Sequence, residues 1–337
     1  MAPSGRERVR ASLALDVADR PPVSAWGHTY DQEWAVESLV NATVANARRY
    51  GFDFVKLQIR ATVFSEAFGA RWRYSGSPDA EPVLELAGGT DASAWRKIGQ
   101  GPVNLAVLAE QVEVVRRVAA ELGPQVPVIQ TVFSPGMVAW FLAGRDTALH
   151  ARLMRDEPGL MAAGLDRIAT VLARFTADSL AAGAAGVFYA INPLADTRLL
   201  GADEYDASYL PSDRVATAAA AAGWFNMLHL CGGNINQGLI AELGMHCVNW
   251  AVDEPGNPGL VEVRDRLGVA VAGGVGRYAP IRAADPGEVR DMAESALRAT
   301  GGRGLLLTPG CSSSPWGGVR PENLRTLVAA AGGNAPT

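Results

Sequence analysis

Phe225-Asn-Met-Leu-His-Leu-Cys-Gly232 places a histidine and a cysteine two residues apart at the end of an apolar run. Side chains two apart in a β-strand point to the same side, so His229 and Cys231 would project together from one strand end. A second apolar run, Gly304-Leu-Leu-Leu-Thr-Pro-Gly310, stops at Cys311. If the two strand ends are neighbours in space, one imidazole and two thiols meet, which is a ligand set typical of zinc.

Eight short apolar runs of this kind alternate with helical segments along the 337 residues. The predicted strands are 23–28, 52–57, 126–132, 186–191, 225–230, 247–252, 269–272 and 304–307. Continuous apolar runs are typical of strands that are buried on both faces of a parallel sheet. Eight such units favour an α/β fold of the (β/α)8 TIM barrel type over a doubly wound open sheet, and we expect one domain over residues 1–337.

Two additions to the barrel are predicted. Residues 6–15 have the pattern of a short N-terminal amphipathic helix, which ends before two prolines. Residues 68–86 alternate around Ser75-Gly-Ser-Pro78 and predict a β-hairpin inserted after the second strand. The long segment after the fourth strand, with Tyr205, Asp206 and Tyr209, is interpreted as a lid over the mouth of the barrel.

Composition excludes several function classes. The formal net charge of −5 argues against a nucleic-acid binder or a membrane-surface protein. Three cysteines, no secretion signal and no apolar stretch of membrane-spanning length favour a protein of the reducing cytoplasm. Lys56 and Lys97 are the only lysines, and we interpret this excess of arginine as a compositional habit.

Chemistry in such barrels is located at the carboxyl ends of the strands, where His229, Cys231 and Cys311 are all predicted to lie. Three protein ligands are typical of a catalytic zinc, which keeps one position open, and Asp253 or Glu254 is a candidate for a displaceable fourth ligand. Two thiolates cancel the charge of the ion, so such a site is poorly suited to making hydroxide from water. It is better suited to holding a substrate thiol as a nucleophilic thiolate. Cys247 starts a strand at the opposite face and is predicted to be a packing residue.

Five further residues are predicted to contact substrate because they lie at or just beyond strand ends. They are His28, Tyr30, Tyr189, Asn192 and Arg277. Among them Arg277 is the best candidate for pairing with a carboxylate or sulfonate of the substrate, since a guanidinium binds such anions in a fork.

Several segments across nearly the whole chain resemble the uroporphyrinogen decarboxylase superfamily. The likeness is carried by RERVRASLAL and DRPPV near the start, EAFGARWRY in the hairpin, VPVIQTVFSPGMVAWFLAGR, VNWAVDEPGNPGLVEVRDRLG and the PENLRTLVAAA helix. The resemblance implies a (β/α)8 barrel, in agreement with the strand count.

Within that superfamily the residues separate two branches. Decarboxylases carry an arginine-rich segment after the first strand and His-Gly-Ile near the eighth, whereas this chain has Ala25-Trp-Gly-His-Thr-Tyr-Asp31 and Pro309-Gly-Cys-Ser-Ser-Ser314. His229, Cys231 and Cys311 instead match the zinc-dependent branch that is similar to methylcobalamin:coenzyme M methyltransferases.

That resemblance implies Zn²⁺ as cofactor, a small-molecule thiol as acceptor and a methylated corrinoid protein, carrying methylcobalamin, as donor. It is also compatible with a homodimer. The loop 311–318 departs from the pattern of the branch, so the acceptor and donor stay open. Two alternatives to thiol alkylation remain at this point: a metal-independent lyase of the decarboxylase type, and a non-catalytic module that binds a corrinoid or a thiol.

Overall fold

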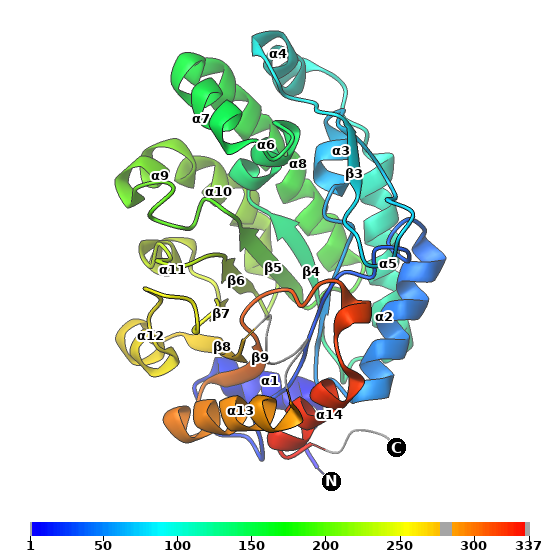
Figure 1. The fold of residues 1–337 in the computed structure, drawn as a ribbon, viewed down its shortest axis with the longest axis vertical. Helices are drawn as coiled ribbons and strands as arrows, with labels where there is room; N and C mark the ends of the chain where they lie inside the picture. The colour runs from blue at the N-terminus through cyan, green and yellow to red at the C-terminus, as the bar shows by residue number, and fades with distance from the viewer. Residues whose placement is uncertain (1, 277–284, 334–337) are drawn as a thin grey trace.

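The computed structural model describes residues 2–276 and 285–333. Its main sheet is parallel and curls into a barrel with helices around the outside (Figure 1). In spatial order the strands are β1 (Val55–Leu57), β4 (Val128–Phe133), β5 (Gly186–Ile191), β6 (Met227–Leu230), β7 (Cys247–Asn249), β8 (Ala270–Val275) and β9 (Leu305–Pro309). The predicted α/β barrel is therefore confirmed.

The eighth position of the barrel is filled by the segment 22–24, between β9 and β1. Val23 forms a parallel bridge with Leu307, and its carbonyl accepts a hydrogen bond of 2.9 Å from the amide of Asp53. The first predicted strand, 23–28, is thus reduced to a single bridge. Pro21 and Pro22 precede it and have no N–H groups to donate, which limits the ladder that this segment can form.

The helices cover the outer face of the barrel. They are α1 (Gly5–Leu13), α2 (Val36–Tyr50), α3 (Val63–Ala67), α4 (Ala92–Gln100), α5 (Ala106–Leu122), α6 (Pro135–Leu142), α7 (Thr147–Asp156), α8 (Pro158–Ala181), α9 (Ala202–Ser208), α10 (Leu210–Thr217), α11 (Gly238–Leu243), α12 (Leu260–Leu267), α13 (Pro286–Thr300) and α14 (Pro321–Ala330). Helix α14, which lies late in the sequence, packs beside helix α2, which lies early in the sequence (Figure 1). Among the helices in the described part of the chain, none combines the length and apolar character needed to cross a membrane.

The N-terminal helix and the hairpin are both present as predicted. The hairpin consists of β2 (Arg71–Arg73) and β3 (Val83–Leu86), which pair in antiparallel fashion. Sequence reasoning missed α6, which begins where Ser134 caps the amide of Met137 and proline occupies the first turn. Nearly every residue of α6 is buried, so the helix lacks the alternation of polar and apolar faces by which helices are recognised.

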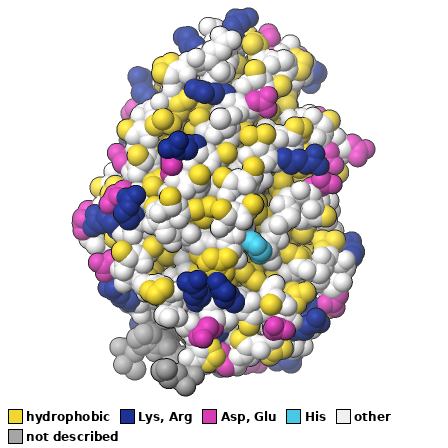
Figure 2. All heavy atoms as spheres, turned by 180° about the vertical axis from the view of Figure 1, so that it is seen from behind, with side chains coloured by type: hydrophobic (Ala, Val, Ile, Leu, Met, Phe, Trp, Pro, Cys, Tyr) yellow, Lys and Arg dark blue, Asp and Glu magenta, His cyan; other side chains and the backbone are white. Residues whose placement is uncertain are grey.

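Figure 2 shows that acidic and basic side chains are interspersed over one face of the molecule. Most of the ion pairs that these side chains form are solvent-exposed and stabilise the fold little. A buried network of ion pairs is centred on Asp53. The Asp53 carboxylate accepts hydrogen bonds from Arg8, from Arg20 and from the amide of Val23. Asp53 thereby joins α1, the closing segment 22–24 and the start of the sheet.

We expect Asp53→Ala to lower the free energy of unfolding by about 3–5 kcal/mol, the usual cost of breaking a buried ion pair. The substitution removes the carboxylate that Arg20 contacts and one of the two carboxylates that contact Arg8, whose side chain is only 10% exposed and keeps its pair with Asp19. Denaturant unfolding monitored by circular dichroism measures the change. Arg48→Ala, which removes an exposed pair with Glu121, is the matched control and should cost less than about 1 kcal/mol.

Candidate metal centre

His229, Cys231 and Cys311 converge at the carboxyl ends of the strands. His229 lies on β6, Cys231 follows two residues later, and Cys311 follows β9. The sulfur atoms of the two cysteines are 3.9 Å apart, and Nε2 of His229 is 3.5 Å from the sulfur of Cys311. The three donor atoms all lie within 4.8 Å of one another, and the side chains are buried. The meeting predicted from the sequence therefore occurs.

These separations fit a single tetrahedral zinc ion. Bond lengths of about 2.3 Å to sulfur and 2.0 Å to nitrogen place tetrahedral ligand atoms roughly 3.5–3.8 Å apart. The sulfur–sulfur distance of 3.9 Å is also far beyond the ~2.05 Å of a disulfide. Soft thiolates with one imidazole suit zinc better than magnesium or calcium, which prefer oxygen.

Asn249 at the end of β7 sets the orientation and tautomer of His229. Its side-chain nitrogen donates hydrogen bonds of 3.0 Å to the carbonyls of Ala272 and Pro309, so its Oδ1 must face the imidazole. The Oδ1 atom lies 2.7 Å from Nδ1 of His229 and accepts the proton there. Nε2 is left as the unprotonated nitrogen and faces Cys311, as a metal ligand must. Sequence reasoning missed Asn249, because an asparagine inside an apolar strand has no distinctive spacing.

Glycine is required immediately before Cys311. A side chain on Gly310 would place its Cβ 2.5 Å from Cα of Ala251, in the loop after β7. Backbone cannot move aside as a flexible side chain can, so only glycine lets the two chains approach this closely. This close approach holds the end of β9, just before Cys311, against the loop after β7.

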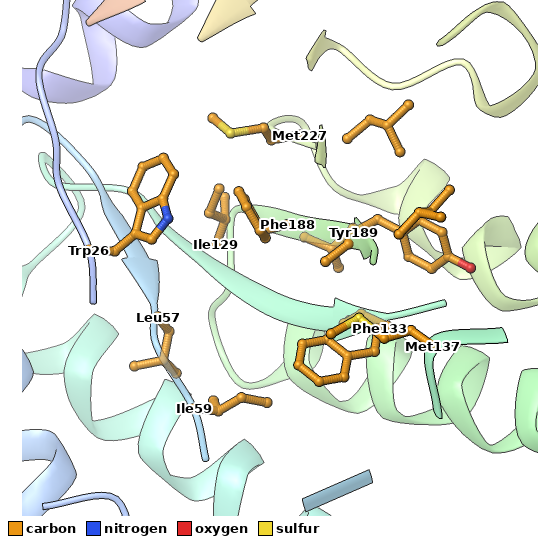
Figure 3. Close-up of a cluster of buried hydrophobic side chains, with 14 of the residues drawn as sticks. Trp26, Leu57, Ile59, Ile129, Phe133, Met137, Phe188, Tyr189 and Met227 are labelled. Carbon is orange, nitrogen blue, oxygen red and sulfur yellow. The ribbon is translucent and has the colours of Figure 1, made fainter. Parts of the chain in front are cut away.

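A cavity of about 480 Å³ opens above the donor atoms. Its apolar wall includes Trp26, Phe133, Met137 and Phe188, which Figure 3 shows gathered at the core of the barrel. The described residues that line the cavity are Trp26, His28, Tyr30, Lys56, Gln58, Ala61, Thr62, Trp72, Glu81, Pro82, Thr131, Phe133, Met137, Trp140, Phe141, Arg145, Phe188, Ala190, Asn192, His229, Cys311, Ser312 and Ser314. A bound ligand could therefore reach His229 and Cys311 from one side.

Lys56 lines this cavity from the middle of β1 and is buried. Its ammonium donates to Oε1 of Gln58 at 2.5 Å and lies 4.6 Å from the ring centre of Phe188. Burial lowers the pKa of Lys56 to about 7, opposed by the charges of Cys311 and Glu33. A buried cation beside a sulfur ligand suits an anionic reaction centre. The signal was present in the sequence: only two of the 30 Lys and Arg residues are lysines, and one of them lies on a barrel strand.

The profile of the family described as uroporphyrinogen decarboxylase (URO-D) matches residues 32–333, which is most of the chain. The chain belongs to the uroporphyrinogen decarboxylase family. No curated protein sequence matches it.

Solved structures that resemble this URO-D family chain are distant in sequence. A methyltransferase from Methanosarcina mazei superposes with a TM-score of 0.79 at 20% identity, over 98% of both chains. A putative vitamin-B12 independent methionine synthase from Listeria monocytogenes gives 0.56 at 15% identity, over 88% of this chain and 86% of the other. A B12-independent methionine synthase from Shewanella sp. W3-18-1, in complex with selenomethionine, gives 0.54 with the same identity and coverage. Identities this low establish a shared fold, on which different chemistries occur.

The structure places the other predicted site residues in different positions. His28, Tyr30 and Asn192 line the cavity with the three donor residues. Asp253 is not brought to them: it is exposed and lines a separate hollow between α12 and α13. Arg277 lies outside the described residues.

Tyr189 is also outside the cavity, because neighbouring residues of a strand face opposite sides. Phe188 and Ala190 face the cavity, whereas Tyr189 points away toward the helices, as Figure 3 shows. Its hydroxyl donates to the fully buried carboxyl of Asp213 at 2.6 Å. Tyr205 donates to the same carboxyl from α9, so the predicted lid is wrong: that segment forms α9 and α10, which pack on the barrel.

Burial raises the pKa of Asp213 to about 7, although both tyrosine hydroxyls act to lower it. An acid whose pKa is higher in the folded state favours folding when protonated, so its contribution is full below about pH 4 and is lost as the pH rises to about 7. We expect the free energy of unfolding of the wild type, relative to Asp213→Asn, to fall across that window and to be constant above it. Urea titrations at a series of pH values measure this difference. A parallel pH dependence of the two proteins would contradict it.

Proposed function

We propose that this URO-D family chain is a zinc-dependent transferase that moves a methyl or other alkyl group onto the sulfur of a small thiol. The observation that carries the proposal is the meeting of one imidazole and two thiol sulfurs, of which the imidazole of His229 and the sulfur of Cys311 face a cavity of about 480 Å³. Three ligands leave a tetrahedral ion one position for substrate.

The charge of the donor set supports sulfur chemistry over hydrolysis. Two thiolates and a neutral imidazole contribute two negative charges, which offset the charge of a zinc ion and weaken its power to acidify water. When bound, zinc would hold the substrate sulfur as a thiolate that remains nucleophilic. His229, fixed by Asn249, and the two cysteines would hold the ion, and Lys56 would add a positive charge beside the reacting sulfur.

The donor that fits this chemistry is a methylated corrinoid presented at the barrel mouth by a partner protein. A methylated corrinoid would supply the methyl group to the sulfur lone pair, and the electron pair of the cobalt–carbon bond would leave with the corrinoid, so the transfer would need no other reagent. The apolar wall of Trp26, Phe133 and Phe188 would exclude water from this step.

A lyase acting on a polycarboxylate is less well supported. It requires cations that are available to several carboxylates. Among the described cavity residues, Lys56 is engaged by Gln58 and Phe188, and Arg145 by Glu81 and the ring of Trp72.

The test combines metal analysis with a transfer assay. The purified protein should contain about one zinc per chain. With methylcobalamin as donor and coenzyme M as acceptor, the absorption spectrum should report loss of the cobalt–carbon bond while mass spectrometry detects the methyl thioether. Because the natural thiol is not fixed, a panel of small thiols is assayed alongside. A zinc-free protein that transfers methyl groups at the same rate would contradict the proposal.

A further inference from the structure

We propose that His28, held by Glu33 and Gln58, is the base that takes the proton from the substrate thiol. The inference rests on the proposed function and adds a catalytic residue to it. Thiols bind metals as thiolates, so a proton must leave the sulfur each time a substrate enters. The three proposed zinc ligands, His229, Cys231 and Cys311, offer no group that can receive this proton.

The first support is a buried carboxylate behind the imidazole. Glu33 is 2% exposed, and its two oxygens lie 2.8 and 3.0 Å from Nδ1 of His28. The amide of Thr29 donates to the same carboxylate at 3.0 Å, which fixes its position. A proton added to His28 would therefore give an imidazolium with a hydrogen-bonded counter-ion already in place.

The second support is the orientation of Gln58, which defines which nitrogen of His28 is available. The ammonium of Lys56 donates to Oε1 of Gln58, so the amide nitrogen of Gln58 must face the imidazole. That nitrogen lies 2.9 Å from Nε2 and 3.4 Å from Nδ1 of His28, so it contacts the ring nearer to Nε2. The carboxylate of Glu33 accepts the hydrogen on Nδ1, which leaves Nε2 as the unprotonated nitrogen of the neutral ring.

The third support is the location of His28 relative to the sulfur ligands. The loop after Cys311 runs beside residues 26–28: the amide of Ser313 donates to the carbonyl of Trp26, and that of Trp316 donates to the carbonyl of His28. His28 and Cys311 consequently line the same cavity, and the ring of Tyr30 stacks on the imidazole at a centroid distance of 5.0 Å. A thiol bound beside Cys311 would therefore share this cavity with the imidazole of His28.

The proton step is balanced without any further reagent. The incoming S–H replaces the amide of Gln58 as donor to Nε2. The sulfur–hydrogen bond breaks, its electron pair remains on sulfur, and the proton forms a new bond to Nε2. Glu33 and Gln58 act as positioning residues, because they touch His28 and not the substrate. The other titratable groups near His28 are Tyr30, stacked on it, and Lys56, on the far side of Gln58.

Counting protons tests this assignment. The full-length protein is loaded with Co²⁺ and titrated with 2-mercaptoethanol, whose binding is followed by sulfur-to-cobalt charge-transfer absorption. Calorimetry in two buffers of different ionisation enthalpy then gives the protons released to solvent. At about pH 7.5, where a free alkyl thiol is still protonated, the wild type should release close to none, because the proton stays on His28 beside the carboxylate of Glu33. His28→Gln should release about one per thiol.

Three further variants make the result decisive. Glu33→Gln should release an intermediate amount, and it replaces His28→Gln if that variant fails to fold. His246→Gln is the matched histidine control, since His246 is exposed on the opposite face, and should behave as the wild type. Release of about one proton by the wild type would overturn the assignment. The assignment would also be overturned if His28→Gln retained the proton and Lys56→Met released it, because Lys56 would then be the proton acceptor. Absence of any thiolate absorption in the wild type would overturn the proposed function as well.

Discussion

Cys311→Ala should lose both bound zinc and alkyl transfer. Removing this sulfur leaves one imidazole and one thiolate, and two ligands do not hold zinc against dialysis. Cys311 also lies within 4 Å of both other donor atoms, so no neighbouring side chain of the cluster can take its place. We expect the zinc content to fall from about one per chain to less than about a tenth of that, as measured by atomic emission after dialysis against a mild chelator.

Cys247→Ala is the matched control for this loss. Cys247 is the remaining cysteine, and it is fully buried at the start of β7, where burial raises the pKa of its thiol well above the usual range. Zinc content and transfer should therefore be retained in Cys247→Ala. If Cys311→Ala retained zinc and activity, the metal centre would not be the one described here.

Asn249→Leu is expected to weaken zinc binding by about 10–100-fold, the usual effect of removing a residue that orients a metal-ligating histidine. The leucine removes the acceptor that holds the proton of His229 on Nδ1, so the neutral imidazole is free to carry it on Nε2, facing the ion. Competition with a chromophoric chelator measures the affinity. Asn249→Asp keeps an acceptor oxygen at this position and should retain a higher zinc affinity than Asn249→Leu. Equal losses of zinc affinity in the two variants would contradict the role of Asn249 in fixing the tautomer of His229.

The barrel and the donor residues were predictable because their signals are local. Residues two apart on a strand share a face, which placed His229 with Cys231, and the convergence of strand ends on one mouth brought in Cys311. The same rule also explains the error at Tyr189. Which face of its strand points inward depends on the pairing of Ala190 with His229, and that register is not encoded in the strand itself.

Other parts of the site depend on contacts between distant segments, which no local pattern contains. Asn249 acquires its role from carbonyls on β8 and β9, and the imidazole of His28 meets Gln58, which lies 30 residues later in the sequence. Asp253 was predicted to be a ligand because it follows a strand, but the loop directs it outward to another hollow. Lys56 was overlooked because its rarity was interpreted as composition.

The single bridge between Val23 and Leu307 has a consequence for biosynthesis. It joins segments from opposite ends of the polypeptide, so the seam of the barrel stays open until the last strand has left the ribosome. Until then the segment 22–24 and strand β8 each expose an unpaired edge, because β9 is the partner of both in the finished protein. Nascent or C-terminally shortened chains should accordingly require chaperones and be degraded quickly, even though nearly all of the hydrophobic core has already been synthesised.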